Sequence, residues 1–190
     1  ELTQAKQGLT VDKQPLINAK TALQQSLDNQ PSTTGMTEAT IQNYNAKRQK
    51  AEQAIQNANK VIENAQPSVQ QVSDEKSKVE QALSELNNAK SALRADKQEL
   101  QQAYNQLIQP TDLNNKKPAS ITAYNQRYQQ FSNELNNTKT NADRILKEQN
   151  PSVADVNNAL NKVREVQQKL NNARALLQNK EDNSALVLSL

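Results

Sequence analysis

Residues 72–107 read VSDEKSK VEQALSE LNNAKSA LRADKQE LQQAYNQ L, and this stretch decides the fold. Written in groups of seven, every group begins with valine or leucine: Val72, Val79, Leu86, Leu93, Leu100 and Leu107. Apolar residues held at one heptad phase form a single stripe along a helix. No proline or glycine lies between Ser68 and Gln109. We therefore predict one continuous helix across the whole stretch.

The chain also repeats itself at a fixed offset of 84, which is twelve heptads and is called the repeat period below. Asp12-Lys13-Gln14 recurs as Asp96-Lys97-Gln98 (96 − 12 = 84), and Pro67-Ser68-Val69 recurs as Pro151-Ser152-Val153 (151 − 67 = 84). A fixed internal period is the signature of repeat architectures. Each proline precedes an apolar heptad series, and the serine after it can cap the first turn of a helix. We predict that the third helix of each unit begins at these two sites.

The stretch before each of these prolines carries the middle helix of its unit. An alanine-rich apolar stripe covers residues 41–65, and a bulkier one, with two tyrosines and a phenylalanine, covers residues 121–146. The offset from the first isoleucine to the following proline is 26 in the first segment (67 − 41) and 30 in the second (151 − 121). Since about 3.6 residues make one turn, we predict that the middle helix of the second unit is one turn longer.

Three helices in each unit and one helix shared between units predict an all-α fold. We expect tandem three-helix bundles that share a long continuous connecting helix, in the manner of a spectrin-like rod. The expected parts are the tail of a preceding repeat's third helix (1–9), two three-helix modules (10–93 and 94–178), and a truncated or non-native tail (179–190). A long dimeric coiled coil is the alternative, and prolines at regular bundle corners argue against it: Pro31, Pro67, Pro110 and Pro151.

The composition argues against several classes of function. The chain has no histidine and no cysteine, so the commonest general base and the usual zinc ligands are missing. Its two glycines, Gly8 and Gly35, are isolated, so they cannot build a phosphate-binding loop. The net charge is +3, and basic residues cluster only at 47–50 and 116–117, whereas nucleic-acid binders carry a basic face. We expect no enzyme activity, no cofactor, no metal, no nucleic-acid partner and a monomeric fragment.

No apolar run approaches the roughly 18 residues that a membrane-spanning helix needs, so we expect no membrane insertion. The candidate ligand contacts lie in the corner segments before the two middle helices: Thr33, Thr34, Met36, Lys116 and Lys117. Met36 is chosen as an apolar residue outside the heptad stripes, because exposed apolar and aromatic anchors dominate binding energy. The tyrosines of the middle helices lie on the stripes, which indicates half-buried structural roles.

Two segments before the middle helices, residues 33–45 (TTGMTEATIQNYN) and 117–125 (KPASITAYN), are related in sequence. Both resemble the start of the middle helix in the FIVAR modules of giant staphylococcal cell-surface proteins. ANKVI at 58–62, followed by Pro67-Ser68, and LNNAK at 86–90 resemble its later parts. The resemblance covers about residues 10–178. It implies a very long, wall-associated protein of tandem three-helix modules, with fibronectin binding attributed to such repeats.

The resemblance supplies no catalytic residues, and this chain departs from the family in one respect. The common repeat of the family pairs a FIVAR module with a smaller GA module, whereas two FIVAR-like units follow each other here. Three functions remain open. The first is an adhesin repeat that binds a host matrix protein, with fibronectin as the expected partner, at the bacterial cell surface or cell wall. The second is a structural spacer or stalk without a specific ligand, and the third is an albumin- or immunoglobulin-binding helical module.

Overall fold

The computed structural model describes residues 10–181, and within them the chain is all-α, as predicted. It divides into two compact units, unit 1 (Glu1–Arg94) and unit 2 (Ala95–Leu190). The helices of the described part are α2 (Gln14–Asp28), α3 (Glu38–Glu63), α4 (Val69–Ser91), α5 (Gln98–Leu107), α6 (Pro118–Gln129), α7 (Ser132–Lys147) and α8 (Val153–Arg174). The tail predicted for residues 1–9, and residues 182–190 of the tail predicted for 179–190, lie outside the described residues.

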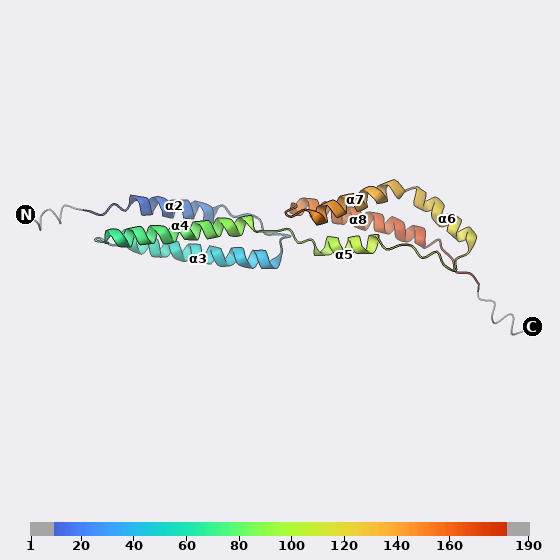
Figure 1. Ribbon diagram of the computed structural model, residues 1–190, viewed down its shortest axis with the longest axis horizontal. Helices are drawn as coiled ribbons and strands as arrows, with labels where there is room; N and C mark the ends of the chain where they lie inside the picture. The colour runs from blue at the N-terminus through green and yellow to red at the C-terminus, as the bar shows by residue number, and fades with distance from the viewer. Residues whose placement is uncertain (1–9, 182–190) are drawn as a thin grey trace, which may run out of the picture. The chain divides into compact units, whose positions relative to one another are not determined.

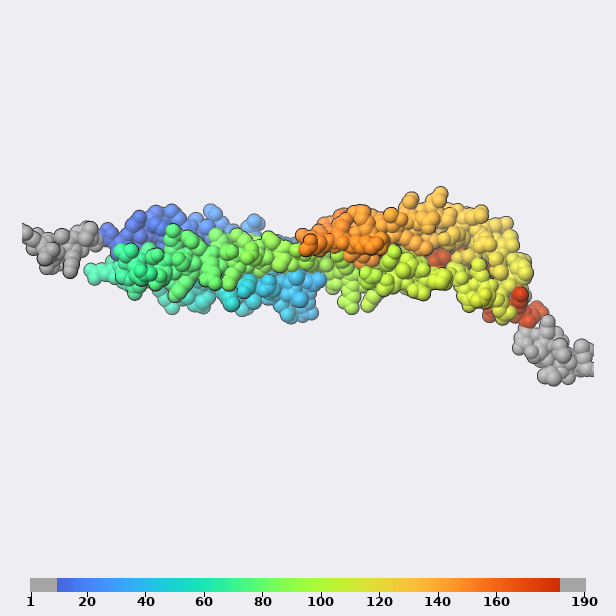
Figure 2. Space-filling model, viewed as in Figure 1, coloured from blue at the N-terminus to red at the C-terminus, as the bar shows by residue number. Residues whose placement is uncertain are grey.

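Unit 1 is a three-helix bundle in which α4 lies alongside both α2 and α3 (Figure 1), and all three helices contact one another. Leucines of α2 and α4 pack against small residues of α3 in its core, where Leu16, Leu23, Ala51, Ala58 and Leu86 are buried. On the face shown in Figure 2, atoms of α4 lie between those of α2 and α3. The alanine-rich stripe of the middle helix therefore forms part of a tightly packed core.

The third helix of each unit begins where the sequence predicts. In α4 the Ser68 hydroxyl accepts a hydrogen bond from the backbone N–H of Gln71 (3.0 Å), and the Gln71 side chain accepts one from the N–H of Ser68 (2.8 Å). In α8 the Ser152 hydroxyl accepts from the N–H of Asp155 at 3.0 Å. These contacts satisfy N–H groups that have no partner inside the helix.

The prediction of one continuous helix shared by the two units is wrong. Helix α4 ends at Ser91 and α5 begins at Gln98, and residues 92–97 between them are not helical. The Arg94 side chain donates to the backbone oxygen of Ser91 at 2.6 Å, and the Asp96 carboxylate accepts from the N–H of Gln98 at 2.9 Å. Because these side chains satisfy groups left free at the two helix ends, the chain can leave and re-enter the helix at little cost.

The two residues of the heptad series nearest this break are both buried. Leu93 is 5% exposed in the core of unit 1, and Leu100 is 0% exposed in the core of unit 2. A heptad pattern reports which residues face a core. It does not report whether the backbone between two such residues is helical.

Replacing Glu99 with proline tests where the helix begins. Residue 99 is the second residue of α5, and unit 1 has a proline, Pro15, at the second position of α2. Proline is tolerated in a first turn because the N–H that it lacks has no partner there. Glu99 also forms an exposed ion pair with Arg164 (3.2 Å). We expect Glu99→Pro to lower the free energy of unfolding by less than about 1 kcal/mol, the usual limit for such a pair, in urea titrations.

The control for this experiment is Gln102→Pro, which places proline inside α5. Interior proline removes a helix hydrogen bond and clashes with the preceding turn, at a cost of about 3 kcal/mol or more. A loss for Glu99→Pro as large as that for Gln102→Pro would mean that the helix runs through residues 92–97 after all.

The first helix of unit 2 is shorter than that of unit 1. Helix α2 ends at Asp28, whose equivalent one repeat period later is position 112, yet α5 already ends at Leu107. Pro110 stands where unit 1 has Ser26 (110 − 84). A proline at that point of a helix would remove a hydrogen bond and clash with the carbonyl four residues earlier. The chain therefore leaves the helix before Pro110.

The middle helix of unit 2, predicted as one helix, is divided into α6 and α7. Tyr124 corresponds to Tyr44 at an offset of 80 (124 − 44), whereas Ala142 corresponds to Ala58 at the full repeat period of 84 (142 − 58). The four extra residues of unit 2 therefore lie between these positions, where the helix breaks and Phe131 is buried. Four residues overshoot one turn by roughly 40°, and a break lets both halves keep their apolar sides toward the core.

A lysine just before the first helix of each unit holds the end of the middle helix. Lys13 Nζ donates to the backbone oxygens of Ile62 and Asn64, both at 2.7 Å. Lys97, its counterpart one repeat period later, makes the equivalent contact with the end of α7, including the backbone oxygen of Leu146 at 3.2 Å. A positive charge is favourable at a helix C-terminus. This contact gives the repeated Asp-Lys-Gln triplet a structural role.

Candidate functional site

The candidate residues of unit 1 lie in the turn before α3. Met36 is partly buried and packs against the core of unit 1, so it is not the exposed anchor that the sequence predicts. Thr34 is exposed and Thr33 is partly buried. The turn includes Gly35, whose φ of 79° is in the region that favours glycine. These residues are placed together on one corner, and whether they contact a ligand stays a prediction.

The candidate residues of unit 2 are engaged within the unit itself. Lys116 Nζ donates to the Asn179 side chain at 2.6 Å, and the backbone N–H of Lys117 donates to the backbone oxygen of Gln178 at 2.8 Å. Lys117 Nζ lies 3.8 Å from a carboxylate oxygen of Glu181. These contacts tie the segment after α8 to the start of α6. A ligand that used either lysine side chain would have to compete with them.

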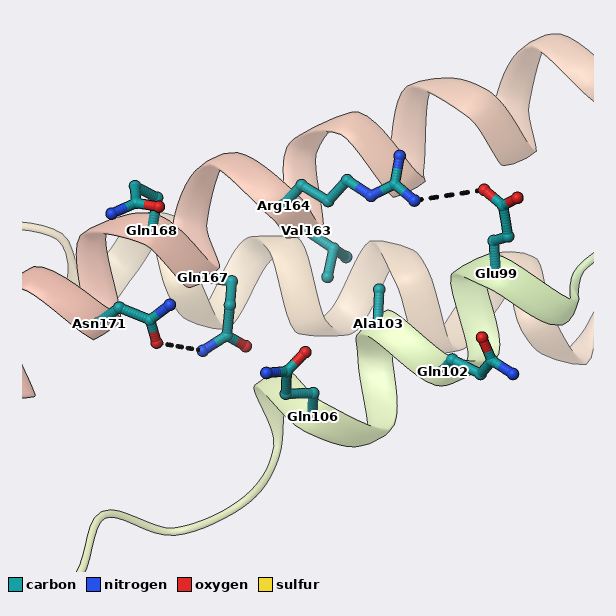
Figure 3. Close-up of a pocket in the computed structure, with 9 residues that line it drawn as sticks. All are labelled: Glu99, Gln102, Ala103, Gln106, Val163, Arg164, Gln167, Gln168 and Asn171. Carbon is teal, nitrogen blue, oxygen red and sulfur yellow. Dashed lines mark hydrogen bonds and ion pairs between the residues drawn. The ribbon is translucent and has the colours of Figure 1, made fainter.

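A groove with amide side chains lies between α5 and α8 (Figure 3). Its volume is about 290 Å³, and the Glu99–Arg164 ion pair lies at one end. Figure 3 shows the side chains of Gln106 and Gln167 pointing toward each other across it. Gln167 donates to the Asn171 side chain at 2.9 Å, while its own amide oxygen is buried without a hydrogen-bond partner in the described structure. One amide acceptor among the residues that line the groove is thus left without a partner in the described structure.

The amide groove is specific to unit 2. At the positions one repeat period earlier, unit 1 has Ala22 in place of Gln106 (106 − 84) and Leu83 in place of Gln167 (167 − 84). Leu83 packs against the core of unit 1. The same pair of helix faces is thus closed by apolar contact in one unit and lined by amides in the other. The two units are not interchangeable at their surfaces.

Glu134 of α7 is the centre of the strongest charge cluster in unit 2. Its carboxylate accepts hydrogen bonds from Lys162 and Lys169 of α8, both at 2.7 Å. The hydrogen bond from Lys162, followed by that from Lys169, holds the pKa of Glu134 below its ordinary value. The same contact raises the pKa of Lys162. The cluster joins α7 to α8 beyond the helix break.

The charge cluster predicts a pH dependence for the stability of unit 2. A carboxyl group with a lowered folded-state pKa stabilises the fold fully above its unfolded-state pKa, and this contribution disappears as the pH falls through the folded value. We expect Glu134→Gln to lower the urea midpoint of unit 2 at pH 7. The difference from the wild type should shrink in the acid range below the ordinary glutamate pKa of about 4.3.

Glu80→Gln is the matched control, because Glu80 forms only one exposed pair in the described structure, with Lys76 at 3.6 Å. Exposed pairs of this kind contribute little, so its midpoint should change less than that of Glu134→Gln. An equal effect of the two substitutions at pH 7, or a difference for Glu134→Gln that does not vary with pH, would contradict the role of the cluster.

Two exposed apolar residues of unit 2 were missed by the sequence reasoning. Ile108 is 42% exposed and Leu113 is 39% exposed, and both lie beside Pro110. A signal for Ile108 was present, because it directly follows Leu107 of the buried stripe, and neighbouring helix positions point about 100° apart. Leu113 had no such signal, because its exposure depends on the path of the chain after α5.

The described residues contain neither a helix that could cross a membrane nor a group of three or more acidic side chains that could hold a metal ion.

Known proteins similar in sequence cover most of this chain. The extracellular matrix-binding protein EbhB of Staphylococcus aureus strain N315 is 42% identical over 175 residues, which cover 92% of this chain and 4% of that protein. The extracellular matrix-binding protein ebh of S. aureus strain NCTC 8325 is also 42% identical, over 92% of this chain and 2% of that protein. The chain thus spans only a few per cent of the length of these relatives.

A solved structure from a characterisation of extracellular matrix binding protein (Embp)-mediated Staphylococcus epidermidis adherence to fibronectin is 38% identical, with a TM-score of 0.48. The match covers 50% of this chain and 60% of the solved chain.

A model of the FIVAR domain matches residues 19–87 and residues 103–171. One match lies in each unit, and the two begin one repeat period apart (103 − 19 = 84). Together the matches cover more than half of the sequence, and the chain therefore belongs to the FIVAR domain family.

Proposed function

We propose that this chain is a repeat segment of a giant bacterial cell-surface adhesin and contributes to attachment to host extracellular matrix. The observation that carries the proposal is the 42% identity to EbhB, a protein named for matrix binding, over 92% of this chain. Two FIVAR domains in one chain fit a modular surface protein. Fibronectin is the matrix partner that the family resemblance implies, and we propose it for this chain.

The chemistry of the described residues fits binding rather than catalysis. The sequence contains no histidine or cysteine, and the grooves of the described part are lined mainly by amides, alkyl groups and tyrosines. We therefore propose a non-enzymatic role at the cell surface, in association with the cell wall. Attachment through many repeats does not need a tight site in each one, because linked weak sites act at a high effective concentration.

The test is to titrate the whole chain against fibronectin and, as a comparison, against serum albumin and immunoglobulin G by isothermal calorimetry. The expected result is saturable binding to fibronectin with a dissociation constant below about 100 μM, which corresponds to about 5.5 kcal/mol. Binding to albumin or immunoglobulin alone would replace fibronectin with a serum protein as the partner. No binding to any of the three would leave the structural spacer as the function.

The spacer role has its own structural support. The lysine contacts at the ends of the middle helices recur in both units, through Lys13 and Lys97. Such contacts stabilise each bundle independently of any ligand. Attachment and spacing are compatible in one chain, since a repeat can extend a filament and also contribute a weak contact.

A further inference from the structure

Unit 2 contains a second groove, at the place where its first helix stops early. The groove has a volume of about 370 Å³ and lies between the segment after Leu107 and helices α6, α7 and α8. We call it the Pro110 groove. Among the described helices of unit 2, α5 contacts α7 and α8 but not α6, whereas in unit 1 the longer α2 contacts α3. The missing end of α5 therefore leaves one side of α6 without a helical neighbour.

The rim of the Pro110 groove is apolar and exposed. The large apolar residues that stand out as exposed in residues 10–181 are Val69, Ile108 and Leu113, and the last two line this groove. Beside them lie the rings of Tyr124 and Tyr128, whose centroids are 5.9 Å apart. Tyrosine and arginine are enriched at binding hot spots, and a partner that covers the apolar rim beside them would remove it from water.

The groove is held in shape by contacts within the unit. Thr111 forms a 2.7 Å hydrogen bond with the Tyr124 hydroxyl and accepts another from Arg174 Nε at 2.9 Å. Arg174 also donates to the backbone oxygen of Gln109 at 2.8 Å. Further along, the backbone oxygen of Asn115 accepts from the N–H of Lys180 at 3.0 Å. A site that is already ordered loses less entropy on binding.

The charge of the Pro110 groove has one sign. Lys139 and Arg174 line it, and no aspartate or glutamate of the described residues does. No ion pair to Lys139 is formed in the described part of the chain. Arg174 is bound to neutral oxygens, so its charge is not neutralised by a carboxylate there. The groove is therefore complementary to a ligand that carries both apolar and acidic groups.

Unit 1 differs at the positions that give the Pro110 groove its character. Gln24 stands where unit 2 has Ile108 (108 − 84), and Asn29 stands where it has Leu113 (113 − 84). Arg48 takes the place of Tyr128 (128 − 48 = 80, the offset that holds before the break) and lies 5.9 Å from the centre of the Tyr44 ring. The apolar rim is thus a property of unit 2.

We propose that the Pro110 groove is a docking site for an extended peptide segment of a partner protein in which an apolar side chain is followed by an aspartate or glutamate. The apolar side chain packs on Ile108, Leu113 and the tyrosine rings, and the carboxylate pairs with Lys139 or Arg174. The volume is at the small end of the about 300–1,000 Å³ range of ligand sites, which suits a few side chains of a peptide. This inference deepens the matrix-attachment function proposed above and rests on it.

The experiment uses the whole chain and two kinds of probe, fibronectin and a pair of labelled synthetic peptides. The peptides are a Leu-Asp-rich twelve-mer and its Leu-Asn counterpart, read by fluorescence anisotropy. The double variant Ile108→Gln with Leu113→Asn introduces the residues of unit 1, and Lys139→Glu reverses one charge. We expect each to weaken binding of fibronectin and of the Leu-Asp peptide about tenfold or more. The Leu-Asn peptide should bind the wild type more weakly than the Leu-Asp peptide.

Val69→Gln is the matched control, because Val69 is the most exposed of these apolar residues, at 71%, and lies in unit 1. It should bind like the wild type, and thermal unfolding should show that all variants remain folded. Unchanged fibronectin and peptide affinities in both groove variants would overturn the docking site while leaving the matrix function in place. Failure of fibronectin to bind, with groove-dependent peptide binding retained, would overturn the proposed matrix function and support the groove. Dimerisation of the wild type that the double variant abolishes would instead assign the groove to a second copy, and so overturn the proposal.

Discussion

Leu16→Ala is expected to destabilise unit 1 by about 2–5 kcal/mol and to leave unit 2 unchanged. Leu16 is 0% exposed and belongs to a core made only of unit 1 residues. Its truncation removes buried methyl groups and leaves a cavity that the neighbouring side chains can fill only in part. Hydrogen exchange followed by mass spectrometry measures the result, since it reports the opening of α2–α4 and of α5–α8 separately.

Leu100→Ala is the matched control for this experiment, because Leu100 lies one repeat period later (100 − 16 = 84) and is also 0% exposed, in the core of unit 2. It should lower the protection of unit 2 alone. If either substitution lowers the protection of both units by a similar amount, the two cores are one cooperative unit. The stability of such a chain would then not be a sum over its repeats.

The core positions on the heptad stripe could be predicted from the sequence. The heptad stripe contains Val79, Leu86, Leu100 and Leu107, and all four are buried. The sites where α4 and α8 begin are also predictable, because the Pro-Ser pairs have a local mechanism. Patterns of this kind are reliable because the fixed period of a helix shows which face carries the apolar residues, and because a cap acts on the turn that directly follows it.

The breaks between helices could not be predicted in the same way. Residues 92–97 contain no proline or glycine, and the helix ends there through the side chains of Arg94 and Asp96. Contacts with distant segments also hold the break: the N–H of Thr37 donates to the backbone oxygen of Arg94 at 2.8 Å, and Lys97 reaches across to the end of α7. The helix propensity of residues 92–97 favours a continuous helix, and tertiary contacts override that propensity.

The candidate site was predictable only in part. The sequence predicts a bundle corner at Pro110 with candidate ligand contacts at Lys116 and Lys117, and the segment between α5 and α6 is not helical. Lys116 and Lys117 instead hold the segment after α8. The exposed apolar residues Ile108 and Leu113 depend on how far α5 extends. Helix α5 ends before Pro110, and the path of the chain after it depends on packing within unit 2.

Phe131→Ala is expected to destabilise unit 2 by about 3–5 kcal/mol. Phe131 is 5% exposed at the break between α6 and α7, and its ring centroid lies 5.6 Å from that of Tyr128. No side-chain cap is lost, because Phe131 makes no capping hydrogen bond at the start of α7. The loss therefore measures core packing, and urea unfolding monitored by circular dichroism is the measurement.

Gln130→Ala is the control at the same break, because Gln130 is exposed, and surface substitutions usually change stability by no more than about 0.5 kcal/mol. If Phe131→Ala costs no more than Gln130→Ala, the break is not organised around the phenylalanine. Phe131 is linked to the Pro110 groove through Tyr128, which both contacts Phe131 and lines the groove. Phe131→Leu fills part of the core but removes the aromatic contact, so it should weaken peptide binding more than it lowers the free energy of unfolding. That result would connect the four extra residues of unit 2 to the shape of its groove.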